Sequence, residues 1–144
     1  MQQKKTRVMK ALYMMVLVLA LGIALSGCSA GKLAEEFDEG VVIAKAEQGI
    51  QCCNQEDFAG LTATMNAAMR SVTTEELFST TIMPIIKEKG AFQSFGETSV
   101  DGKHDKDTDT DFAVITVLAK YEQGNILYTV SVDKNLKIAG FYLK

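Results

Sequence analysis

The chain has 144 residues, with 15 basic and 18 acidic side chains and a net charge of −3. This length is typical of a single domain that folds on its own core, without metal ions or disulfides. Four of the basic residues lie in the first ten positions, so residues 28–144 hold 11 basic against 18 acidic side chains, a net charge of −7. Nucleic acids and anionic lipid surfaces select basic proteins, so this balance argues against either as a partner of the polypeptide itself.

The N-terminus has the pattern of a secretory signal. Residues 1–10 are basic and contain no acid, residues 11–25 form an uncharged apolar run, and small residues follow. A run of 15 residues is shorter than the roughly 20 that span a bilayer. The sequence therefore favours a cleaved signal peptide over a retained transmembrane anchor.

The end of this run, Leu25-Ser26-Gly27-Cys28, resembles the lipobox of bacterial lipoproteins. In that family a diacylglyceryl group is joined to the cysteine sulfur, and the signal peptidase cuts just before the cysteine. The resemblance implies a signal peptide over residues 1–27, a tether over residues 28–32 with its lipid on Cys28, and one domain over residues 33–144. Two or more acyl chains hold a protein stably at a membrane. We therefore expect anchoring on the extracytoplasmic face of the cell membrane; a secreted protein with a coincidental cysteine is the alternative.

Helical spacing predicts two helices in the first part of the domain. Early acids and periodic apolar residues predict the first over residues 34–51. Asn54 is the predicted N-cap of the second. The apolar face of this second helix would carry Phe58, Leu61, Met65 and either Ala68 or Met69.

A third helix is predicted from a capping box, in which Thr73 is the cap and Glu76 lies three residues on. Pro84 should kink or split this helix near residues 81–83. Gly90, which follows basic residues, should end it.

Beyond Gly90 the pattern predicts strands. Residues 112–118 are apolar on both faces, which is typical of a central strand. Gly140, inside the last strand, indicates a bulge or a close backbone contact. Three helices followed by an antiparallel meander predict an α+β domain with the helices on one face of the sheet. The predicted strands cover residues 92–103, 111–122, 126–133 and 136–143, with a hairpin turn at residues 123–125.

The order of several short motifs resembles the short envelope lipoproteins grouped as domain of unknown function 3887. The resemblance covers about residues 33–144 and implies a cystatin-like or nuclear-transport-factor-2-like cone, with a curved four-stranded sheet wrapped on helices. In that family the domain also precedes α/β-hydrolase domains, which implies an accessory or binding role, and no catalytic residues are established. The motifs, in chain order, are Asn54-Gln55-Glu56-Asp57-Phe58, Thr73-Thr74-Glu75-Glu76-Leu77, Gly90-Ala91-Phe92 and Asp133-Lys134-Asn135-Leu136-Lys137-Ile138-Ala139-Gly140-Phe141.

The acids Asp105, Asp107 and Asp109 alternate like the opening ligands of a calcium loop. Counted from Asp105, however, position 6 is Thr110 rather than glycine, and position 12 is Thr116 rather than glutamate. A solvated hairpin accounts for these acids without a ligand and is favoured over weak calcium binding. We therefore predict no metal site and no cofactor, with these three aspartates as weak candidates only.

Reactive groups are few. The adjacent Cys52 and Cys53 are favoured as small packed side chains, with a redox or thiol role as the alternative. His104 is the only histidine, so any imidazole-dependent chemistry would have to use it. No serine-nucleophile, phosphate-loop or zinc-protease motif occurs in the sequence. Acid–base catalysis by two carboxylates, such as Glu47 and Glu97, has no motif or spacing in the sequence that supports it.

Six aromatic residues gather in the predicted sheet. Core packing of these rings is favoured, and an apolar concavity that accepts a small ligand or peptide is the alternative. The six are Phe92, Phe95, Tyr121, Tyr128, Phe141 and Tyr142.

These observations favour a lipid-anchored bacterial envelope protein whose domain binds a small molecule or a protein outside the membrane, without catalysis. Two enzymatic alternatives stay open. A thiol-dependent enzyme or redox sensor using Cys52 and Cys53 requires an accessible thiol of low pKa. A small-pocket enzyme of the cone fold requires a carboxylate of perturbed pKa in a cleft.

Overall fold

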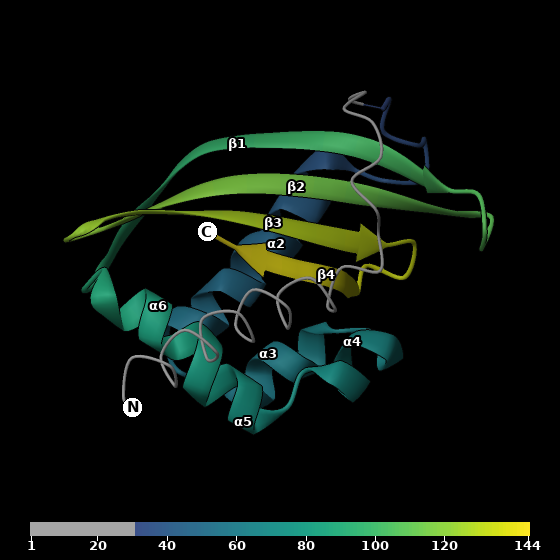
Figure 1. Cartoon of the computed structure of the whole chain (residues 1–144). Helices are drawn as coiled ribbons and strands as arrows, with labels where there is room; N and C mark the ends of the chain where they lie inside the picture. The colour runs from purple at the N-terminus through teal and green to yellow at the C-terminus, as the bar shows by residue number, and fades with distance from the viewer. Residues whose placement is uncertain (1–30) are drawn as a thin grey trace, which may run out of the picture.

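The computed structural model describes residues 31–144, so the predicted signal peptide and Cys28 lie outside the described residues. Helices come first and a four-stranded antiparallel sheet of order β1-β2-β3-β4 follows, which confirms the α+β prediction. Figure 1 shows the sheet arching over α2, with the shorter helices below. Within residues 31–144, no helix is long and apolar enough to cross a bilayer.

The first helix, α2 (Glu39–Asn54), begins five residues later than predicted and ends three residues later. Its N-cap is Asp38, whose carboxylate accepts a hydrogen bond from the Val41 N–H at 3.0 Å. The acids at positions 35 and 36 therefore precede the helix instead of forming its first turn. The prediction failed because it took every early acid as helical, whereas a capping aspartate marks the boundary.

The predicted second helix is two helices, α3 (Phe58–Thr64) and α4 (Ala67–Val72). Met65 breaks the helix because it is extended and pairs with Ile138 in an isolated parallel bridge. Asn66 then caps α4 by accepting from the Met69 N–H at 2.9 Å. A tertiary contact with the last strand thus overrides the local helical pattern.

The predicted third helix is split, as expected from Pro84. It comprises α5 (Glu75–Leu77), the π-helical turn η1 (Phe78–Ile82) and α6 (Met83–Glu88). Pro84 lacks an N–H and crowds the preceding turn, so the helix widens just before it. The cap is Thr74, whose hydroxyl accepts from the Leu77 N–H at 3.1 Å, so the predicted capping box at Thr73 is wrong. Instead, Thr73 closes α4 by donating its N–H to the Met69 carbonyl at 2.9 Å.

The sheet follows the predicted meander with shifted turns. The β2–β3 turn is at residues 122–123, one residue early, because Gly124 already pairs with Tyr121. The last strand starts two residues late, since Leu136 adopts a positive φ of 58° in the turn. The strands are β1 (Phe92–Asp105), β2 (Thr110–Tyr121), β3 (Gly124–Asp133) and β4 (Ile138–Leu143).

The sheet has three register shifts, of which two bend β1 and the third, in β4, confirms a prediction. The β1–β2 register shifts twice near the start of β1, between Phe92 and Ser94 and between Phe95 and Thr98. Such bulges increase strand curvature, which lets the sheet wrap over α2. In β4 the register shifts beside Gly140, which pairs with Ser131, so the predicted bulge is present.

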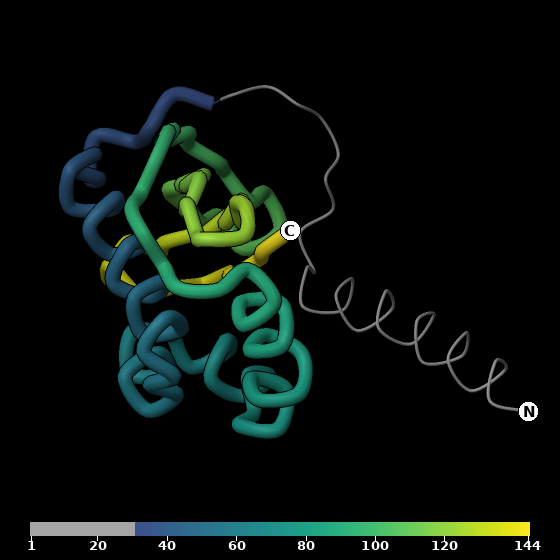
Figure 2. Tube along the Cα trace, turned by 90° about the vertical axis from the view of Figure 1, so that its left-hand side faces the viewer, coloured from purple at the N-terminus to yellow at the C-terminus, as the bar shows by residue number. Residues whose placement is uncertain are grey.

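The core fills the concave side of the sheet. From α2 it receives Val42, Ala46, Ile50 and Cys53, all fully buried at helical spacing. Figure 2 shows α2 on one side of the strands and the remaining helices beneath them. The strands contribute their alternate residues, namely Ala113, Ile115, Val117 and Ala119 of β2 and Ile126, Tyr128, Val130 and Val132 of β3.

Candidate functional site

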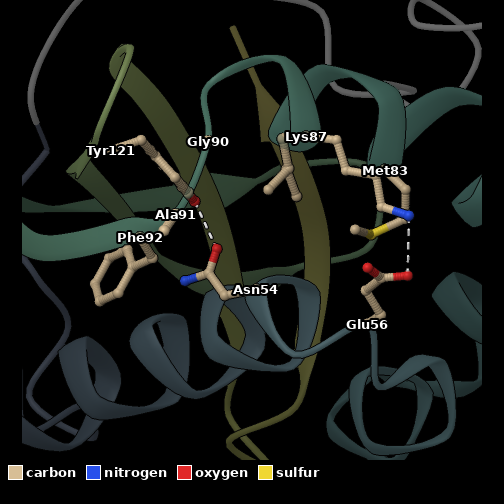
Figure 3. A pocket seen from close by; sticks show the side chains of 9 residues that line it. Asn54, Glu56, Met83, Lys87, Gly90, Ala91, Phe92 and Tyr121 are labelled. Carbon is tan, nitrogen blue, oxygen red and sulfur yellow. Dashed lines mark hydrogen bonds and ion pairs between the residues drawn. The ribbon is translucent and has the colours of Figure 1, made fainter.

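A cleft of about 220 Å³ opens at one end of the sheet, where the end of α2, helix α6 and the start of β1 meet (Figure 3). Its volume corresponds to about seven water molecules, which suits a small ligand. The lining combines apolar walls with a few polar groups, as ligand sites do. The lining residues are Asn54, Glu56, Met83, Ile86, Lys87, Gly90, Ala91, Phe92 and Tyr121.

Two buried hydroxyl groups connect the floor of the cleft to the core. Tyr121 Oη lies 2.7 Å from Asn54 Oδ1 and 2.8 Å from Tyr128 Oη. A carbonyl oxygen only accepts, so Tyr121 donates its one proton to Asn54 and accepts the proton of Tyr128. Burial raises the pKa of both tyrosine hydroxyls. Both phenols therefore stay protonated at neutral pH, which leaves neither available as a general base.

An ion pair spans the mouth of the cleft. Lys87 Nζ lies 3.2 Å from Glu56 Oε2, and the two side chains are 59% and 57% exposed. An exposed pair of this kind contributes at most about 1 kcal/mol, so a ligand can separate it at little cost. Glu56 has a φ of 55°, a left-handed conformation that is uncommon outside glycine. This turn ends α2 and brings the Glu56 carboxylate to Lys87 on α6.

The wall between α6 and β1 is fixed by backbone contacts. Gly90 ends the helix as predicted, with a φ of 75°, and its N–H donates to the Lys87 carbonyl at 3.1 Å. The next N–H, of Ala91, donates to Glu122 Oε2 at 3.0 Å. A Cβ on Gly90 would lie 2.8 Å from the same carboxylate oxygen. The turn that lines the cleft therefore requires glycine.

Sequence reasoning missed the cleft because its residues had other interpretations. Asn54 was the predicted cap of the second helix, but it is the last residue of α2 and faces Tyr121. The cap of α3 is instead Asp57, which accepts from the Gly60 N–H at 2.8 Å. Lys87 was interpreted only as a basic residue near a helix end. The sequence carries no signal that these residues meet, because the cleft joins three elements far apart in the chain.

The cysteines are packed side chains. Cys53 is fully buried, and burial raises its pKa to about 12. Cys52 is half-buried; its pKa is raised by burial and, to a smaller extent, by the charge of Asp57. Both are free thiols. Because a reactive cysteine needs a lowered pKa, these two thiols lack the property that the thiol alternative requires.

The acidic hairpin uses its side chains for local contacts. Asp105 Oδ1 accepts from the Asp107 N–H at 2.9 Å, and this bond lowers the pKa of the Asp105 carboxyl. His104 lies between two other acids, 2.9 Å from Asp111 Oδ1 and 3.5 Å from Asp109 Oδ1. Within residues 31–144, no three carboxylate, imidazole or thiol groups come together in a way that could hold a metal ion.

Five of the six aromatic rings lie on the concave side of the sheet, whereas Tyr142 lies on the outer face, opposite Thr129. Tyr128 packs edge-on against Phe141, and Phe92 contacts both Phe95 and Tyr121. Helix α2 occupies the sheet concavity that the sequence left open as a ligand site, so only its end, beside Phe92 and Tyr121, forms the cleft.

A second hollow of about 430 Å³ lies on the outer face of the sheet. It is an open surface of strand side chains and contains Glu97, one of the two carboxylates considered from the sequence. The cleft is the stronger candidate, because it brings a buried hydroxyl network and an ion pair together with apolar walls.

Comparison with known proteins identifies the family. A protein from Ruminococcus gnavus ATCC 29149, solved by NMR, superimposes with a TM-score of 0.70 over 78% of this chain and 96% of that one. The two are 23% identical, so this likeness shows the fold alone. No curated protein matches the sequence. The family model described as "Protein of unknown function (DUF3887)" matches residues 46–141, two thirds of the sequence, and the chain therefore belongs to that family.

Proposed function

We propose that this protein is a lipid-anchored component of the bacterial cell envelope, and that its domain binds a small molecule in the cleft between α2, α6 and β1. The observation that carries the binding role is the cleft itself, where the exposed Glu56–Lys87 pair lies above a buried network of hydroxyls. The anchoring role is supported by the lipobox resemblance at Cys28 and by the acidic balance of the domain, which gives the polypeptide no attraction of its own to anionic membranes.

The cleft suits a small amphipathic ligand. Phe92, Met83 and Ile86 supply apolar contact, while the mouth offers one positive and one negative side chain. A ligand with an apolar body and a single charge would displace one member of the ion pair and bind the other. Binding without chemistry is favoured because burial keeps the tyrosine at the floor neutral and raises the pKa of both thiols, of which Cys53 is fully buried.

Two probes of opposite charge test the binding role. Phenylacetate would bind Lys87, and phenethylammonium would bind Glu56. We expect at least one probe to shift the backbone NMR signals of Ala91 and Tyr121 in residues 29–144. Lys87→Gln should abolish the response to the anion only, and Glu56→Gln the response to the cation only. Lys89→Gln, two residues further on at the end of α6 and outside the cleft lining, is the matched control and should leave both responses unchanged. If neither probe shifts these signals, the cleft is not a ligand site of this kind.

Mass spectrometry tests the anchor. The full chain expressed in a bacterium should yield an N-terminal peptide that begins at Cys28 and carries a diacylglyceryl group. Cys28→Ser should remove the lipid and leave the leader uncut. An unmodified Cys28 in the wild-type protein would contradict the anchoring role while leaving the binding role open.

A further inference from the structure

The start of the described chain is fastened to the sheet. The Gly102 N–H donates to the Gly31 carbonyl at 2.8 Å, so the two residues form an isolated antiparallel bridge at the free edge of β1. Both positions need glycine. A Cβ on Gly102 would collide with the Lys32 carbonyl oxygen, and one on Gly31 would collide with the Gly102 carbonyl oxygen. Two backbones approach here more closely than any side chain allows.

The residues that follow are part of the domain. Phe37 is only 7% exposed, and Leu33 and Ala34 pack against the core. The Phe37 N–H donates to the Ala34 carbonyl at 3.0 Å, which closes a turn before α2. The chain is therefore held in place from Gly31 onward, and only two residues separate Gly31 from Cys28.

The fastening point and the cleft lie at opposite ends of β1. Phe92, which lines the cleft, is ten residues before Gly102 in the same strand, roughly 33 Å at the usual rise and somewhat less along a bent strand. Figure 1 shows the dark blue start of the described chain far from α6, which borders the cleft. Cys28 lies at most about 11 Å from Gly31, because three residues span no more than that when fully extended.

Resting on the proposed lipidation of Cys28, we infer that the anchor holds the domain with its β1–β2 hairpin toward the membrane and its cleft directed away from it. The cleft then lies beyond the reach of lipid headgroups. Its ligand is consequently a small water-soluble molecule of the extracytoplasmic space, and not a bilayer lipid.

Distance to the membrane tests this orientation on the full-length, lipidated protein in vesicles that carry a headgroup spin label. A fluorophore is placed either on the hairpin, by Lys106→Cys, or at the β2–β3 turn beside the cleft, by Gln123→Cys. Both variants also carry Cys52→Ala, and the buried Cys53 stays unlabelled. We expect quenching at position 106 to exceed quenching at position 123 by about threefold or more, because most of the length of β1 separates the two sites. Equal quenching, or stronger quenching at position 123, would overturn the inference.

A variant that releases the fastened segment, residues 31–37, from the edge of β1 supplies the control. Gly102→Val should free the segment while keeping the β1–β2 pairing, and the ratio of quenching between the two sites should then fall toward one. Gly31→Val, which lies outside every strand, makes the same break if the first variant fails to fold. An unchanged ratio in a folded variant would show that the bridge does not set the orientation.

The outcomes separate this inference from the proposed function. An unmodified Cys28 overturns the anchor and the orientation together. A lipidated protein with equal quenching overturns the orientation alone. Binding of phenylacetate or phenethylammonium should be equally tight, within about twofold, for vesicle-bound protein and for residues 29–144 in solution, since a cleft that faces away from the membrane is not covered. Binding that is lost on the vesicle would overturn the orientation and leave the cleft as a ligand site.

Discussion

The direction of the hydroxyl chain at the cleft predicts an unequal effect of two similar mutations. The Tyr128 hydroxyl donates to Tyr121, which donates to Asn54. Tyr128→Phe removes only a donor, and the Tyr121 proton keeps its acceptor, so the loss should be about 0.5–1.5 kcal/mol of unfolding free energy. Tyr121→Phe leaves the fully buried Tyr128 hydroxyl without a partner, which should cost about 1–3 kcal/mol.

The double mutant tests the chain more sharply than either single change. Once Tyr121 is phenylalanine, the Tyr128 hydroxyl is a buried donor with no acceptor, so removing it should restore stability. We therefore expect Tyr121→Phe with Tyr128→Phe to be more stable than Tyr121→Phe alone, with a coupling energy of about 1 kcal/mol or more. Asn54 is half-buried and can bind water in place of the lost hydroxyl.

Urea unfolding of residues 29–144, followed by circular dichroism at neutral pH, gives the four free energies of this cycle. Tyr142→Phe is the matched control, because within residues 31–144 its hydroxyl makes no hydrogen bond and it lies on the outer face, opposite Thr129. Its effect should stay within about 0.5 kcal/mol. Additive losses in the double mutant would show that the two hydroxyls do not form one chain.

Three further predictions concern packing and pH. Gly49→Ala should destabilise the domain by about 1–3 kcal/mol, because its Cβ would lie 2.7 Å from the Ile138 side chain. Gly40→Ala, on the exposed first turn of α2, is the control and should be neutral or stabilising by up to about 1 kcal/mol. The urea midpoints of the two variants test this difference. Burial raises the pKa of Cys53 from 9.0 to about 12, so the unfolded state loses the thiol proton at lower pH than the folded state. The free energy of unfolding should therefore fall as pH rises above 9, by about 1 kcal/mol between pH 9 and 10. Urea titrations at each pH should show that Cys53→Ala lacks this contribution to the pH dependence. Thiol labelling of the folded domain at pH 8 should leave Cys53 unmodified and label Cys52 slowly, and rapid native labelling of both would revive a thiol role.

Local signals in the sequence predicted those elements whose causes are local. Pro84 splits the third helix because it lacks an N–H, and Gly90 ends it because the chain must turn through a positive φ. The run at residues 112–118, apolar on both faces, likewise predicted a central strand, and β2 lies between β1 and β3 in the sheet. Met65 was misread for the opposite reason, since its extended conformation depends on Ile138, which lies on the last strand.

The cleft and the fastened segment could not be predicted from the sequence for the same reason, because both depend on contacts between residues far apart in the chain. Asn54 was interpreted as a helix cap because an asparagine before acids is typical of one. In the structure its side-chain carbonyl instead accepts a hydrogen bond from the Tyr121 hydroxyl on β2. Gly31 was interpreted as part of the tether over residues 28–32, yet it pairs with Gly102 at the edge of β1. In each case a residue with an ordinary local interpretation acquires its role from a partner on a distant strand. Because β1 borders the cleft at one end and binds the start of the domain at the other, its length sets the distance between the proposed anchor and the proposed ligand.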